Sequence, residues 1–90
     1  MHAPLQSLQI GPNPAQGHLN LQFARMGKGK LSISLYDLAG RRQSDLYKDR
    51  FPAGGQNLRL ELPDGLAEGL YFLRLETDSG SLSRPILIDR

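Results

Sequence analysis

Alternation of apolar and polar residues is the feature that most limits how this chain can fold. In residues 19–23, 31–35 and 58–62 every second residue is apolar, and the residues between them are polar. Successive side chains of a β-strand point to opposite faces, so a period of two predicts strands with one buried face. The pattern is repeated less regularly near the C-terminus by Leu82, Ile86 and Ile88.

Short segments rich in Gly, Pro, Asp or Asn separate these runs at intervals of about 8 to 12 residues. They lie at residues 11–17, 26–29, 37–40, 52–55, 63–69 and 78–80. We therefore predict an all-β fold, an immunoglobulin-like antiparallel β-sandwich of about seven strands in two sheets. The side chains expected to face its core are Leu19, Leu21, Phe23, Leu31, Ile33, Leu35, Leu58, Leu60, Tyr71, Leu73 and Leu75.

Three less regular segments complete the predicted strands. Residues 70–75 are apolar on both faces, which favours a central strand, and a fainter strand is expected at residues 5–10. Residues 42–50 are mostly polar, and polar strands tend to lie at sheet edges, where charge discourages aggregation. A helical turn has room only at residues 66–68, because Pro and Gly residues flank this segment.

Residues 37–40 carry the signature of a specific hairpin turn. Asp37 at the first position favours a type I turn, and Gly40 supplies a left-handed backbone position. This combination closes a three-residue hairpin with a bulge, so we expect it to join the third and fourth strands.

Composition excludes several classes of function. The formal net charge is only +2, and the two signs alternate along the chain, so no binding of nucleic acid is predicted. Cysteine is absent, which excludes disulfides and zinc sites with Cys ligands. No apolar run approaches the roughly 20 residues of a membrane-spanning helix, so no such helix is predicted. We expect no catalytic residue, metal site or cofactor. His2 and His18 have no companion ligand nearby in sequence, and residues 27–30 lack the spacing of a phosphate-binding loop.

Four motifs occur in a fixed order along the chain. Pro12-Asn13-Pro14 comes first, residues 35–40 and 69–76 follow, and a short strand ends the sequence. In order, spacing and terminal position the chain resembles the C-terminal sorting domains of the type IX (Por) secretion system, from about residue 10 to residue 90. The motif residues that this resemblance marks for partner recognition are Pro12, Asn13, Pro14, Tyr36, Asp37, Gly40, Gly69, Tyr71, Arg84, Ile86 and Ile88.

The resemblance implies a non-enzymatic export signal of a Gram-negative bacterium. Its implied partners are an outer-membrane translocon, a shuttle barrel and a sortase-like protease, and its cargo is secreted or held at the cell surface. No Sec-type signal lies within the 90 residues. We therefore expect residues 1–90 to be a single, monomeric C-terminal domain of a larger secreted protein, with residues 1–4 as linker or cloning residues.

The chain departs from the family pattern at two positions. Gly11 stands where the family often has an aromatic residue before Pro-Asn-Pro, and Pro85 interrupts the last strand between a cation and its aliphatic residues. Since proline cannot donate to a sheet, Pro85 is expected at an open edge or a bulge. The alternative function is an immunoglobulin-like or fibronectin type III-like spacer, or a carbohydrate-binding module, of a secreted enzyme.

Overall fold

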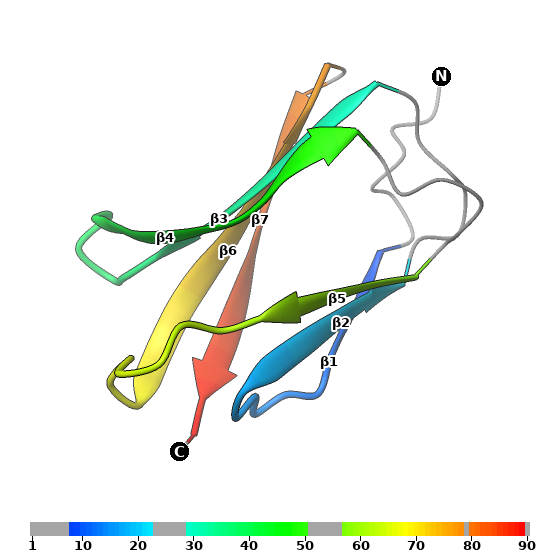
Figure 1. Ribbon diagram of the computed structural model, residues 1–90. Coiled ribbons are helices and arrows are strands. Elements are labelled where there is room, and N and C mark those ends of the chain that lie inside the picture. Colours follow the sequence, from blue (N-terminus) through cyan, green and yellow to red (C-terminus); the bar gives the residue numbers. More distant parts are fainter. Residues whose placement is uncertain (1–7, 23–28, 51–56, 79, 90) are drawn as a thin grey trace.

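The computed structural model describes residues 8–22, 29–50, 57–78 and 80–89 (Figure 1). These residues form seven strands: β1 (Gln9–Gly11), β2 (His18–Gln22), β3 (Lys30–Tyr36), β4 (Arg42–Arg50), β5 (Asn57–Glu61), β6 (Gly69–Thr77) and β7 (Gly80–Ile88). The all-β prediction is confirmed. Several predicted features lie outside the described residues: the segment 1–7 with His2, the side chains of Phe23 and Phe51, and the predicted turns at 26–28 and 52–55.

The strands pair into two antiparallel sheets that face each other (Figure 1). One sheet has the order β1-β2-β5 and the other the order β4-β3-β6-β7. In an immunoglobulin constant domain the fourth strand lies beside the fifth in the larger, four-stranded sheet. Here β4 pairs with β3 instead, so the sheet that contains the C-terminal strand is the larger one.

The inward faces of both sheets form the core, as the alternation predicted. Leu73 and Ile33 are fully buried, whereas Leu58, the second residue of the edge strand β5, is only half-buried. The other buried side chains of the predicted core are Leu19, Leu21, Leu31, Leu35, Leu60, Tyr71 and Leu75. Leu8, Ala15, Leu62, Ile86 and Ile88 complete the core.

Strands β4 and β6 lie at the predicted positions, one at an edge and the other inside the four-stranded sheet. The polar strand β4 lies at one edge of the four-stranded sheet, and its register with β3 shifts twice, after Ile33 and after Leu35. Such bulges twist an edge away from further pairing. Strand β6 lies between β3 and β7, but only one of its faces is covered, since Leu70 and Phe72 are exposed.

The suggested helical turn at residues 66–68 is wrong. No helix occurs within the described ranges, and the chain turns at Asp64 and Gly65 instead. The carbonyl of Ala67 accepts a hydrogen bond of 2.7 Å from the Tyr71 hydroxyl. This contact takes up a carbonyl that a helical turn would have offered to a backbone N–H group.

Candidate functional site

The exposed edge of β7 meets the Pro12-Asn13-Pro14 segment near the C-terminus. The Leu87 N–H donates to Asn13 Oδ1 at 3.1 Å, and the Leu87 carbonyl accepts from the Ala15 N–H at 2.8 Å. The Asp89 N–H donates to the Ala15 carbonyl at 2.8 Å. The Pro-Asn-Pro segment thus covers the last part of this edge.

The rest of the β7 edge is open in the described part of the chain. Backbone groups of alternate strand residues point to opposite sides, so Ser81, Ser83 and Pro85 face the same way as Leu87, away from β6. No described residue bonds to the outward groups of Ser81 and Ser83. Pro85 points its donor-free nitrogen to this side, which confirms its predicted place on an open edge.

The side chains of β7 divide by the same alternation. Ile86 and Ile88 are buried in the core, and Pro85 and Leu87 are exposed on the outer face. Arg84 is half-buried opposite Leu73. It forms no ion pair with any residue of the described ranges, so its charge is available to a partner.

The β3–β4 hairpin has the predicted turn. The Gly40 N–H donates to the Asp37 carbonyl at 3.0 Å, and the Asp37 N–H donates to the Arg41 carbonyl at 3.0 Å. Gly40 has a φ of 82°, whereas no non-glycine residue described has a positive φ, as a type I turn with a glycine bulge requires.

The carboxylate of Asp37 holds this turn closed. It accepts hydrogen bonds of 2.9 Å from the N–H groups of Ala39 and Arg41, and its second oxygen accepts 2.9 Å from Arg41 Nε. The backbone N–H of Arg41, followed by its guanidinium, lowers the pKa of Asp37 despite partial desolvation of the carboxyl group. The sequence motif around Asp37 therefore has a clear structural role.

The two motif tyrosines differ in their surroundings. Tyr71 is buried near the start of β6, and its bond to Ala67 resembles the tyrosine corner of immunoglobulin-like sandwiches. Tyr36 is only half-buried. The Arg42 guanidinium lies 5.9 Å from its ring centre and 3.5 Å from its hydroxyl oxygen. Of the two, only Tyr71 is a buried aromatic residue whose hydroxyl bonds to the backbone.

Most of the motif residues gather at one end of the four-stranded sheet. Gly69 pairs with Ile88, and Ala15 bridges to the same isoleucine from the other side. Tyr71 pairs with Ile86, and Tyr36 lies in register with Phe72, so the Asp37 hairpin projects from the same end. Arg84 is farther along β7. Gly69 has a φ of 148°, a conformation that favours glycine at this strand start.

Sequence reasoning missed Ala15 and Leu87, which make the backbone contacts of this site. Ala15 is fully buried, and its small side chain directly after Pro14 was the signal that could have indicated close packing. Leu87 is exposed. The alternation of β7 predicts that its side chain faces outward, but it does not predict which segment bonds to its backbone.

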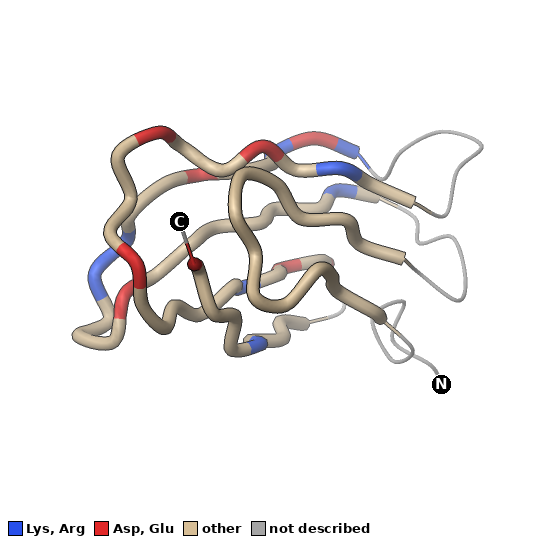
Figure 2. The backbone as a smooth tube through the Cα atoms, turned by 90° about the horizontal axis from the view of Figure 1, so that it is seen from below, with Lys and Arg blue, Asp and Glu red and all other residues tan. Residues whose placement is uncertain are grey.

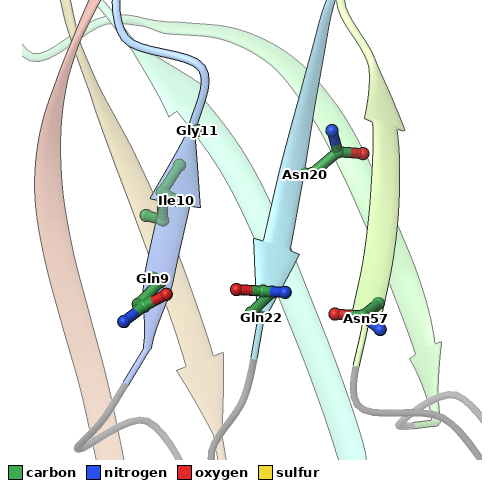
Figure 3. A pocket seen from close by; sticks show the side chains of 6 residues that line it. All are labelled: Gln9, Ile10, Gly11, Asn20, Gln22 and Asn57. Carbon is green, nitrogen blue, oxygen red and sulfur yellow. The ribbon is translucent and has the colours of Figure 1, made fainter.

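A second feature lies on the outer face of the three-stranded sheet. There Gln9, Gln22 and Asn57 lie side by side on three neighbouring strands (Figure 3). With Ile10, Gly11 and Asn20 they line a hollow of about 470 Å³. These lining residues carry neutral amides without an aromatic ring or titratable group, so the hollow does not favour catalysis or sugar stacking.

Positions of Lys and Arg and positions of Asp and Glu are interspersed along the described backbone (Figure 2). Within these ranges no three His, Cys, Asp or Glu residues lie close enough together to hold a metal ion. No helix in the same ranges is long and apolar enough to cross a membrane. The strongest candidate site is the edge of β7 beside Arg84, which is open along the described chain before Asn13 and Ala15 contact it.

The comparison with known families identifies the chain. A family model described as "Secretion system C-terminal sorting domain" matches residues 9–89, from the first strand through the contacts at Asp89. The chain belongs to the C-terminal sorting domain family of the type IX secretion system. A comparison with curated proteins finds no match. The family of sorting domains indicates a non-catalytic role and secretion across the outer membrane of a Gram-negative bacterium.

Proposed function

We propose that this sorting domain is a non-enzymatic export signal that the secretion machinery reads along β7. The observation that carries the proposal is the meeting of two motifs from opposite ends of the chain, Pro12-Asn13-Pro14 and the terminal strand, in one edge. Asn13 and Ala15 hold the end of β7 in place, and no described residue pairs with the preceding edge. The signal is then a folded surface, assembled only when the domain folds.

Recognition follows from the chemistry of an open edge. An extended segment of a partner adds to Ser81, Ser83 and Pro85 as a further strand, with main-chain hydrogen bonds giving affinity. Arg84, half-buried beside this edge, selects a partner with a nearby carboxylate. In this proposal Ile86 and Ile88 do not contact the partner but stabilise the folded domain, because their side chains are in the core.

We further propose the route that the family suggests. A cargo domain precedes this single domain in the same polypeptide, passes through the outer-membrane translocon, and is received by a shuttle barrel. A sortase-like protease then removes the monomeric sorting domain, and the cargo reaches the cell surface or the medium.

Export of a fusion tests the proposal. The domain is fused to the end of a foreign periplasmic protein in a bacterium with a type IX system, and the exported fraction is measured. Removing residues 86–90 should abolish export, but it also deletes two core side chains and so threatens the fold.

Two substitutions separate recognition from folding. Arg84→Glu reverses the charge beside the edge, and Ser83→Pro removes an outward N–H that no described residue uses. Both variants should keep the thermal midpoint and lose export. Arg50→Glu, on the opposite edge strand β4, is the matched charge reversal and should be exported normally. Normal export of both folded β7 variants would reject recognition along this edge.

A further inference from the structure

Exposed apolar side chains cluster on the outer face of the four-stranded sheet, next to the open edge. Leu70 pairs with Leu87, and Phe72 pairs with Pro85 in the adjacent row. Leu70, Phe72 and Leu87 are 41%, 36% and 43% exposed, and Pro85 is exposed as well. We call these four residues the outer apolar patch. Contiguous apolar patches of this kind mark interaction sites, whereas single exposed apolar residues do not.

Two arginines flank this patch. Arg42 lies in the row of Phe72, on the far side of Tyr36, and Arg74 lies in the next row of β6. Their contacts with Asp45 and Glu76 are both 3.5 Å long and exposed to solvent. Since exposed ion pairs contribute little free energy, both guanidinium groups can exchange these carboxylates for those of a partner at small cost, and the contact of Arg42 with Tyr36 is separate from its ion pair.

The geometry points to a protein as the occupant of this surface. Leu70, Phe72 and Leu87 are each more than half covered by neighbouring residues, so they do not project from the sheet as membrane-inserting side chains do. An apolar centre with an aromatic ring and arginines around it is the composition typical of protein interfaces.

We propose that the outer apolar patch docks a protein of the secretion machinery whose contact surface has an apolar centre and carboxylates facing Arg42 and Arg74. This inference rests on the proposed export function and adds a second contact beside the β7 edge. A partner strand paired with Ser81 to Pro85 directs alternate side chains to the same outer face. One partner can therefore occupy the edge and the patch together.

The first test measures export of patch variants in the fusion described above. The double variant Leu70→Thr/Phe72→Thr keeps strand-forming residues on the exposed face and should retain the fold. We expect it to lower the rate of export about tenfold, the loss typical of one interface anchor. Arg74→Glu should also slow export. Leu38→Thr is the matched control, because Leu38 is 65% exposed in the hairpin turn and lies off the patch.

The outcomes distinguish this inference from the proposed function. Failure of the unaltered fusion to be exported would overturn the export function itself. Export of the unaltered fusion together with equal export of the folded patch variants would overturn the docking surface alone. A measured loss of thermal stability matching the loss of export would assign the patch to folding and overturn its docking role.

A photo-crosslinking residue in place of Phe72 identifies the occupant. An adduct between the fusion and a protein of the secretion machinery, absent when Leu38 carries the same crosslinker, supports the proposal. An adduct between two copies of the fusion, an adduct with lipid alone, or no adduct during active export would each overturn it.

Discussion

Asn13 and Leu87, 74 positions apart in the sequence, are joined by a hydrogen bond of 3.1 Å from the Leu87 N–H to Asn13 Oδ1. The backbone of Ala15 adds two bonds of 2.8 Å to the same stretch of β7. Together these contacts close one end of an edge strand that is otherwise open along the described chain. The Pro-Asn-Pro motif near the N-terminus thus holds the end of the C-terminal strand β7 in place.

Removing the Asn13 side chain should loosen the end of β7. In Asn13→Ala the Leu87 N–H loses its acceptor, and we expect the free energy of unfolding to fall by about 1 kcal/mol. Hydrogen exchange of the Leu87 amide should become faster. Asn20→Ala is the control, because Asn20 is exposed on β2 and has no side-chain partner among the described residues. Unchanged exchange in Asn13→Ala would contradict the role of this bond.

The β3–β4 turn should tolerate a β-branched residue at position 39 better than at position 40. Gly40→Val places a side chain on a backbone with a φ of 82°, which we expect to lower stability by about 1–2 kcal/mol. A Cβ atom at position 40 would meet no described atom within 4 Å, so the loss arises from the backbone alone. Denaturant midpoints of Gly40→Val and Ala39→Val measure the difference. Equal losses would refute the assigned turn.

Stability contributed by Asp37 should depend on pH. Its pKa is lowered in the folded state by hydrogen bonds, chiefly from the Arg41 N–H. The contribution is therefore present above the ordinary value of 3.8 and is lost as the pH falls through the lower folded value. Asp37→Asn should be less stable than the unaltered domain at neutral pH. The difference in thermal midpoint should shrink in strong acid, and a constant difference would contradict this linkage.

Truncation of two adjacent residues of β6 should lower stability to different degrees. Leu73 is fully buried, and Leu73→Ala should lower the free energy of unfolding by roughly 2–5 kcal/mol through lost burial and an unfilled cavity. Phe72→Ala removes a larger side chain from the outer face, and its loss should be within about 1 kcal/mol. Chemical denaturation of both variants compares them directly. Similar losses would show that the outer face is covered in the isolated domain.

Local pattern was enough to predict the strands and their buried faces. The polar segment 42–50 coincides with β4 at an edge, and the Asp37 turn joins the predicted strands. Apolar residues on both sides of β6 predicted its central place correctly. They did not show that Leu70 and Phe72 are exposed, because the hydrophobicity of a side chain does not reveal whether another layer of the protein covers it.

The sequence by itself determined the period of two, the turn chemistry and the proline that marks an edge. Each depends on residues close together in the chain, through the alternation of strand side chains and the backbone preferences of Gly and Pro. Only the tertiary structure decided that Asn13 bonds to Leu87 and that Ala15 bridges to Ile88. These contacts join segments far apart in sequence, and no local periodicity specifies which distant backbone groups come together when the two sheets pack.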